Sequence, residues 1–283
     1  MLPLDPAALV GVGAGPPERA APTASAQQIA TFVLEYGVAR HLRALGLPID
    51  AMFGYSVGEY VAACLAGVFG LESALAAMAA EATAADALPP GAMIAVPLSE
   101  RDCTELLRQG VWLAAVEAPA LCVLSGLPDP IADVEAELRR RHVAVLRLPA
   151  EHPFHTPLAQ EIRPQARRAL EREGLRPPAI PVVSCVTGTW LTPGEAVSAT
   201  YWATRRGRTI RFADGMRTLA REPRRFYVDV SDGGTLIPLV LANFGGQPDL
   251  ASRAVAVVRR TAGGPTPLPL EEVVAAWRSA GPV

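Results

Sequence analysis

Lysine is absent from this chain of 283 residues, so all 26 of its basic side chains are arginines. Together with the abundance of alanine, glycine and proline, this absence indicates a GC-rich genome rather than a special role for arginine. An excess of charge is missing too, because the formal net charge is −2. So small a charge creates no strong field, which argues against nucleic acid or a membrane surface as a partner.

Cysteine is scarce, and the few thiols are far apart in the sequence without a C-x-x-C pair. We therefore expect structural thiols in a reducing compartment, with no zinc site and no other bound metal or redox cofactor. The four cysteines are Cys64, Cys103, Cys122 and Cys185. Long apolar runs are lacking, as are the charged and apolar regions of a signal peptide. These absences predict a cytoplasmic protein without a membrane span.

One short motif stands out, the pentapeptide Gly54-Tyr55-Ser56-Val57-Gly58. It follows an apolar run at residues 51–53 and opens an alanine-rich helical stretch at residues 57–65, the context in which G-x-S-x-G forms a nucleophile elbow. The glycines permit a sharp turn that exposes the serine hydroxyl at a helix N-terminus. There the free N–H groups and the helix dipole favour a developing oxyanion. Ser56 is therefore a candidate nucleophile, although short Gly/Ser motifs also recur by chance.

Half of the residues are hydrophobic and 19% are charged, which is typical of a globular enzyme with one large or two modest domains. Residues 90–151 predict the order β-α-β-β-α-β, a ferredoxin-like unit. We expect this small subdomain to be inserted into a large α/β-hydrolase-like domain formed by residues 1–89 and 152–283, built around a mostly parallel sheet. The predicted strands are 51–53, 93–97, 111–117, 121–125, 143–148, 180–186 and 225–230. The predicted helices are 26–45, 57–65, 71–87, 99–109, 128–141, 158–174, 212–221 and 236–243.

A serine nucleophile needs a base, and the chain offers four histidines. His41 lies on the first predicted helix and His142 ends a charged one, so both suit a surface or packing role. His152 and His155 lie in the segment 151–157, where the inserted unit returns to the large domain and where a cleft is expected. The alternative is a surface loop with two partly exposed histidines.

Several further segments resemble the malonyl-CoA:acyl carrier protein transacylase family, and in particular the acyltransferase domains of polyketide synthases. The elbow and Glu59-Tyr60 resemble that family's G-H-S-x-G-E-Y, and the segment 152–157, His-Pro-Phe-His-Thr-Pro, resembles its H-A-F-H-S-P. The resemblance runs collinearly from about residue 22 to residue 260. Other matches are Ala66-Gly67-Val68, Gly91-Ala92-Met93, Ser125-Gly126, Val186-Thr187-Gly188, Tyr201-Trp202 and Arg211-Phe212-Ala213-Asp214.

The resemblance implies a mechanism that agrees with the residues. Ser56 would be the nucleophile that forms an acyl-enzyme, and His155 its general base and later the acid. The N–H of Val57 would be one oxyanion donor. A backbone carbonyl in the Ser184-Cys185 stretch would orient the histidine. The substrates would be thioesters of 4'-phosphopantetheine on coenzyme A or acyl carrier proteins, and acyl carrier proteins would be the partners.

The most consequential departure from the family is Glu81, because family members that use malonyl units carry an arginine at this distance from the serine. Arginine grips a carboxylate in bidentate geometry, whereas a glutamate would repel malonate. The departure predicts a non-malonyl acyl group, and Glu81 could pair with the ammonium of an aminoacyl or peptidyl thioester. The alternative is that Glu81 turns to solvent.

Three further positions belong to the predicted substrate site. Tyr55 replaces the histidine before the serine, and Glu117 replaces an asparagine of the family's A-A-V-N-x-P. Both could be structural, but with Glu81 they suggest a pocket rebuilt for a larger or cationic acyl group. His152 keeps the family's specificity-motif position, although without the arginine it does not indicate malonyl.

The N-terminus departs as well, because the family's first strand and G-Q-G loop, which supplies a second oxyanion N–H, have no counterpart here. Losing one such donor typically lowers the rate about a hundred- to a thousandfold. A trimmed or misassigned start, a replacement from residues 11–15, or a degenerate site would each explain it.

These observations favour an acyltransferase that moves a non-malonyl group through acyl-Ser56 between pantetheine thioesters. One alternative is an editing thioester hydrolase, which shares the acyl-enzyme. Another is a catalytically weak module that only docks a carrier protein. Arg205, Arg206 and Arg208 are candidates for docking an acidic carrier protein, or simply a solvated surface.

Overall fold

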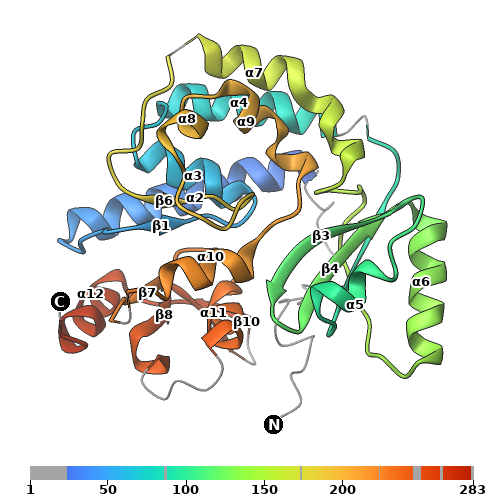
Figure 1. Cartoon of the computed structure of the whole chain (residues 1–283). Helices are drawn as coiled ribbons and strands as arrows, with labels where there is room; N and C mark the ends of the chain where they lie inside the picture. Colours follow the sequence, from blue (N-terminus) through green and yellow to red (C-terminus); the bar gives the residue numbers. More distant parts are fainter. Residues whose placement is uncertain are drawn as a thin grey trace.

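The computed structural model describes residues 24–85, 88–172, 174–222, 224–244, 250–261 and 264–281. Three groups of elements lie around the centre of the molecule (Figure 1). One group carries the serine motif on a short parallel strand pair covered by helices. The second is a four-stranded sheet with two helices, and the third holds the C-terminal strands and helices. The predicted α/β fold class is confirmed. The segment 11–15 lies outside the described residues.

The serine motif connects strand β1 (Met52–Phe53) to helix α3 (Val57–Leu65). β1 runs parallel to β6 (Val182–Val183), with Met52 opposite Val182. Helix α3 is almost entirely buried because its short apolar side chains pack against α2 (Ala24–Ala44), α4 (Leu71–Ala85) and aromatic rings from α9 (Ala199–Thr204). Tyr60 and Trp202 are two of the largest fully buried side chains. This packing holds the start of α3 in a fixed position.

The four-stranded sheet consists of β2 (Ala92–Val96), β3 (Val111–Ala118), β4 (Leu121–Gly126) and β5 (Leu146–Leu148). Its spatial order is β3-β4-β2-β5, and all neighbours are antiparallel. Helix α5 (Glu100–Thr104) is capped by Ser99, as predicted, because the Ser99 hydroxyl accepts from the Asp102 N–H; α6 (Pro128–Arg140) also packs on this sheet. The predicted β-α-β-β-α-β order is confirmed, while the division at residues 90–151 stays a prediction.

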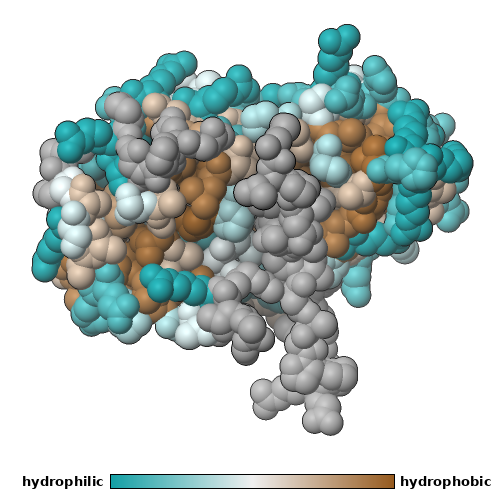
Figure 2. All heavy atoms as spheres, turned by 90° about the horizontal axis from the view of Figure 1, so that it is seen from below, coloured by the Kyte–Doolittle hydropathy of each residue, from teal (hydrophilic) through white to brown (hydrophobic). Residues whose placement is uncertain are grey.

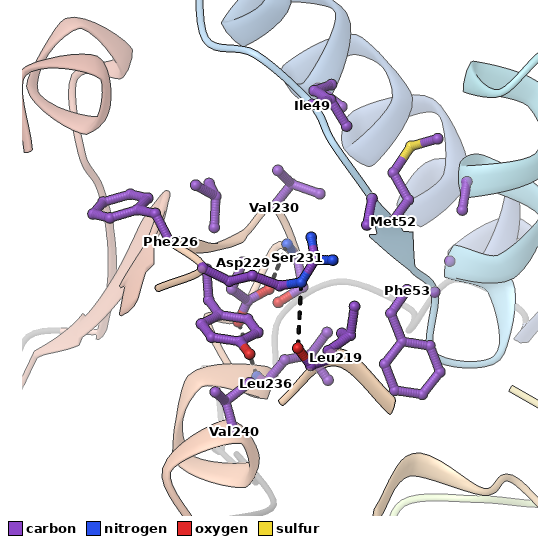
Figure 3. Close-up of a pocket in the computed structure, with 18 of the residues that line it drawn as sticks. Ile49, Met52, Phe53, Leu219, Phe226, Asp229, Val230, Ser231, Leu236 and Val240 are labelled. Carbon is purple, nitrogen blue, oxygen red and sulfur yellow. Dashed lines mark hydrogen bonds between the residues drawn. The ribbon is translucent and has the colours of Figure 1, made fainter. Parts of the chain in front are cut away.

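The third group places strand β7 (Tyr227–Asp229) parallel to β8 (Ala254–Ala256). Helices α10 (Phe212–Leu219), α11 (Leu236–Phe244) and α12 (Leu270–Ser279) accompany them, with a hairpin of β9 (Val258–Thr261) and β10 (Gly264–Pro267). A cavity of about 950 Å³ separates β7 from β1. Ile49, Met52 and Phe53 line it from one side, and Phe226 and Val230 from the other (Figure 3). Seen from below, hydrophobic side chains gather in two areas of the surface (Figure 2).

Two predicted elements are interrupted in the structure. The helix expected at residues 158–174 is divided into a 3₁₀ turn, η1 (Pro157–Ile162), and α7 (Arg163–Glu171). The strand expected at residues 180–186 ends at Val183, because the Ser184 hydroxyl accepts from the N–H groups of Val186 and Thr187 and turns the chain. The sequence pattern did not predict β8–β10, α9, α12 or the short helix α8 (Pro193–Ala196).

The four cysteines are all buried, and they belong to three different hydrophobic clusters. Cys64 lies in the cluster around α3, and Cys185 lies in the cluster between β6 and α10. Cys103 and Cys122 share the core of the four-stranded sheet. None of the helices described combines the length and the apolar character that spanning a bilayer requires.

Candidate active site

Ser56 occupies a strained turn at the start of α3. Its φ is 51°, in the left-handed region that non-glycine residues rarely adopt. The turn is so tight that a Cβ atom on Gly54 would collide with the backbone of Gly58. Glycine at position 54 is therefore a steric requirement. Val57 is the first residue of α3, so its N–H belongs to the first turn, whose N–H groups have no partner within the helix.

His155 is the residue that faces the serine. Its Nε2 lies 3.0 Å from Ser56 Oγ, and its Nδ1 lies 3.1 Å from the carbonyl oxygen of Arg208. A carbonyl only accepts, so Nδ1 carries the proton and Nε2 is left as the acceptor for the serine hydroxyl. His155 also has a left-handed φ, 59°, and its loop packs so closely on Gly91 that a Cβ there would collide with Pro153.

The orienting carbonyl expected at Ser184-Cys185 is therefore corrected to Arg208. The carbonyl of Ser184 accepts from the Gly188 N–H, and that of Cys185 accepts from the Arg211 N–H at 2.7 Å. The Arg208 segment is fixed instead by strand β3. The N–H of Ile210 donates to a carbonyl of this strand, and the carbonyl of Ile210 accepts from the Val116 N–H.

A small cavity of about 320 Å³ opens beside the serine and histidine. Tyr55 and Glu117 meet at its wall, where the Tyr55 hydroxyl donates to Glu117 Oε1 at 2.8 Å. Its other lining residues are mostly apolar and come from distant segments: Gln28, Val57, Met93, Leu148, Phe154, Arg206, Thr235, Leu236 and Leu239. A cavity of this size, with apolar and polar groups on its wall, suits a short acyl chain.

The profile of the family described as "Acyl transferase domain" matches residues 17–261. The chain belongs to the acyl transferase domain family. The predicted family and enzyme class are thereby confirmed, and the chain is an acyltransferase domain.

Two solved structures and one curated protein illustrate the similarity. A phenolphthiocerol/phthiocerol polyketide synthase protein of Mycobacterium tuberculosis is 38% identical over 209 residues, covering 74% of this chain and 14% of that protein. The acyltransferase domain of SpnD, in complex with 2-(pent-4-yn-1-yl)malonyl, is 35% identical with a TM-score of 0.79; the match covers 85% of this chain and 58% of that one. Malonyl CoA-acyl carrier protein transacylase from Burkholderia pseudomallei is 25% identical with a TM-score of 0.71, covering 80% and 81%.

Burial is the main cause of a strongly lowered pKa at His155 of the acyltransferase domain. Together with the positive charges of Arg205 and Arg206, it lowers the pKa of His155 from 6.5 to about 3, although the Arg208 carbonyl acts in the opposite direction. The imidazole is therefore neutral at physiological pH, which is the form able to accept a proton from a hydroxyl group.

We expect the rate of Ser56 acylation to stay level from about pH 8 to about pH 5, with no loss near the ordinary histidine pKa. The rate falls only as the pH approaches about 3, where His155 takes a proton. The same shift makes stability depend on pH. Below about pH 6.5 the histidine of the unfolded chain binds a proton that the folded domain does not, so the free energy of unfolding decreases as the pH is lowered. Single-turnover acylation across a pH series checks the prediction, and a midpoint near 6.5 would contradict it.

Glu81 of the acyltransferase domain lies in a buried ionic cluster rather than at the acyl cavity. Its Oε1 accepts from the Tyr60 hydroxyl at 2.8 Å, and its Oε2 lies 2.6 Å from Arg206 Nε and 3.6 Å from Arg205 Nη2. The side chain is only 1% exposed, so the solvent-facing alternative is wrong. The expectation that Glu81 contacts the acyl group is also corrected, because its carboxylate lies against Tyr60, Arg205 and Arg206, and other residues line the cavity beside Ser56.

The three arginines expected at the surface separate into two kinds. Arg205 and Arg206 are buried beside Glu81, and only Arg208 is exposed. Arg205 Nη1 donates to the carbonyl oxygen of Ser56 at 2.8 Å, and its guanidinium lies over the Tyr60 ring at 4.1 Å. Through these two contacts Arg205 fixes the elbow, a role that composition alone does not reveal.

Two other residues differ from the sequence-based expectation: the role of Glu59 was not predicted, and His152 lies apart from Ser56 and His155. Glu59 is fully buried and accepts from the Cys185 N–H and the Tyr201 hydroxyl, which fastens α3 to the turn after β6. The position of Glu59 directly after the G-x-S-x-G motif was the sequence signal from which this role could have been predicted. His152 Nδ1 lies 3.4 Å from the Pro89 carbonyl oxygen, and its ring meets Phe154 edge-on, so its part in substrate binding stays a prediction.

Proposed function

We propose that this acyltransferase domain moves a non-malonyl acyl group between pantetheine thioesters through an ester on Ser56. The observation that carries the proposal is the contact of 3.0 Å between Ser56 Oγ and the acceptor nitrogen of a neutral His155, at the wall of an acyl-sized cavity. Nucleophile, base and orienting carbonyl are all in hydrogen-bonding reach, which is the arrangement that covalent acyl transfer requires.

The chemistry follows from these atoms. Ser56 Oγ attacks the thioester carbonyl while His155 Nε2 takes its proton, and the resulting oxyanion is stabilised by the N–H of Val57 at the start of α3. The intermediate collapses with loss of the thiolate, which receives the proton from His155. In the second half, the acceptor thiol gives its proton to His155 and attacks the ester, and Ser56 recovers its proton as the new thioester leaves.

The contacts of Arg206 support a non-malonyl group. Its Nε is paired with Glu81, its Nη2 donates to Gln28, and the Phe154 ring lies 5.6 Å from the guanidinium carbon. The arginine that lines the acyl cavity is therefore already paired with a carboxylate of the protein, and a malonyl carboxylate would have to compete with Glu81 for it.

The relatives suggest the setting in which the domain acts. The chain spans 14% of the curated polyketide synthase protein that it resembles. We propose that it works in polyketide assembly and that acyl carrier proteins, or coenzyme A, present the thioesters. The exposed Arg208, whose carbonyl orients His155, is suited to contact an acidic carrier protein near the site.

Hydrolysis is the second candidate function. Ser56 lines the larger cavity as well as the smaller one, so water has a second approach to an acyl-Ser56 ester. A silent docking module is disfavoured by the Ser56–His155 contact, which a protein without chemistry does not need.

Intact-mass measurement with acyl-pantetheine thioesters tests the proposal. We expect one acyl mass on the wild-type domain and none on Ser56→Ala, while the matched Ser73→Ala variant in helix α4 is acylated normally. Adding a carrier protein with a free pantetheine thiol should move the acyl group to that protein. Release mainly as free acid would instead show a hydrolase, and no adduct on the wild type would contradict both functions.

A further inference from the structure

The acyl cavity contains one acidic and one basic side chain besides the histidine, and they differ in how far the protein satisfies them. Arg206 is paired with Glu81 and Gln28. Glu117 is 4% exposed and receives one side-chain hydrogen bond, from Tyr55 to Oε1. Its Oε2 is buried and has no hydrogen-bond partner among the residues that the structure describes.

A buried carboxylate oxygen without a hydrogen-bond donor is unfavourable. Apolar side chains, among them Met93, Leu148 and Leu239, form part of the wall of the same cavity and offer no donor. Burial raises the pKa of Glu117, although the bond from Tyr55 opposes the shift. A donor on the bound substrate would remove this cost, and a positively charged donor would remove most of it.

We propose that Glu117 recognises an ammonium group on the acyl chain, so that the domain selects short aminoacyl thioesters. The inference rests on the proposed function, because it names the acyl group that Ser56 carries. It moves cation recognition from Glu81, whose carboxylate forms an ion pair with Arg206 and accepts from Tyr60, to the carboxylate that lines the cavity.

The position of Glu117 limits where the ammonium lies. The phenol of Tyr55, the residue before the nucleophile, contacts Glu117 directly. The carboxylate is thus about one tyrosine side chain away from the elbow, and the volume of about 320 Å³ leaves room for only a short chain. An amine a few bonds from the thioester carbonyl, as in a β-amino acyl group, matches this distance.

Three pantetheine thioesters of nearly equal shape separate the possibilities: β-aminobutyryl, β-hydroxybutyryl and isovaleryl. We expect the wild-type domain to acylate Ser56 with β-aminobutyryl about thirtyfold faster than with isovaleryl, and clearly faster than with β-hydroxybutyryl. In Glu117→Gln the preference should disappear, so the readout is the ratio of the β-aminobutyryl rate to the isovaleryl rate. Formation of isovaleryl-Ser56 on the variant, with a normal melting transition, shows that it is folded.

Two further variants act as controls. Tyr55→Phe removes the donor to Oε1 and keeps the carboxylate, so the preference for the amine should persist. Glu105→Gln changes an exposed glutamate after helix α5, and it should leave all rates as they are.

Several results would overturn the inference. Equal rates for the aminoacyl and isovaleryl thioesters, or a preference that survives Glu117→Gln, would remove Glu117 as the recognition group. Equal rates for the amine and the hydroxyl would reduce it to an ordinary hydrogen-bond acceptor. Faster reaction with malonyl-pantetheine would assign recognition to Arg206 instead. In all of these cases acyl-Ser56 still forms, whereas failure of every thioester to form an adduct would refute the proposed function itself.

Discussion

Replacing His155 with alanine is expected to slow Ser56 acylation by about a thousand- to ten-thousandfold. The serine hydroxyl then has no acceptor at 3.0 Å, and the departing thiolate has no proton donor. Binding of the thioester should change little, because the loss falls on proton transfer. Single-turnover acylation followed by intact mass, at several thioester concentrations, separates the rate constant from the affinity.

A second histidine provides a matched control for this change. His142 also has a left-handed φ, 57°, but it is exposed at the end of helix α6. His142→Ala therefore reproduces the loss of an imidazole at a strained position without touching the site, and its acylation rate should stay close to that of the wild type. If His155→Ala retained more than about a tenth of the wild-type rate while melting normally, His155 would not be the base.

Glu81→Gln is expected to lower the free energy of unfolding by about 3 to 5 kcal/mol. The change leaves Arg205 and Arg206 buried without their shared carboxylate, so two adjacent cations repel each other in a region of low dielectric constant. Urea unfolding, followed by circular dichroism, measures the effect. The matched Glu72→Gln variant lies exposed on the same helix and should change stability by less than about 0.5 kcal/mol.

The double variant Glu81→Gln with Arg206→Gln tests the pairing itself. It removes one cation with the anion, and we expect it to recover a substantial part of the stability that Glu81→Gln alone loses. Strictly additive losses, or a Glu81→Gln variant as stable as the wild type, would show that the cluster does not stabilise the domain.

Ser56 could be proposed from the sequence because it lies in a short local motif whose spacing is fixed by the turn it forms, whereas the choice of His155 over His152 came from the resemblance to the family. The Glu81 cluster could not be predicted, because its members come from α4 and from the segment after α9, and their contact depends on how those helices pack. The Arg208 carbonyl was missed for a different reason. A backbone oxygen can belong to any residue, so its position leaves no trace in the sequence.

The fold shows the same contrast between local and distant determinants. The four-stranded sheet was predicted because its strands are apolar runs separated by clear turn signals. By contrast, strands were predicted at residues 51–53 and 180–186, but not the pairing of β1 with β6, which joins Met52 to Val182. Strands of two residues carry no usable alternation, and their pairing depends on the helices packed around them.

The rates at which the four buried cysteines react can report local opening of the domain. A thiol reagent in solution cannot reach them in the closed state, so each cysteine reacts only as fast as its cluster opens. Labelling of Cys64 reports opening of the cluster around α3, and labelling of Cys185 reports opening of the cluster between β6 and α10. Labelling of Cys103 and Cys122 reports opening of the core of the four-stranded sheet. The order in which these thiols become labelled would therefore reveal which of the three regions loosens first, without a single engineered probe.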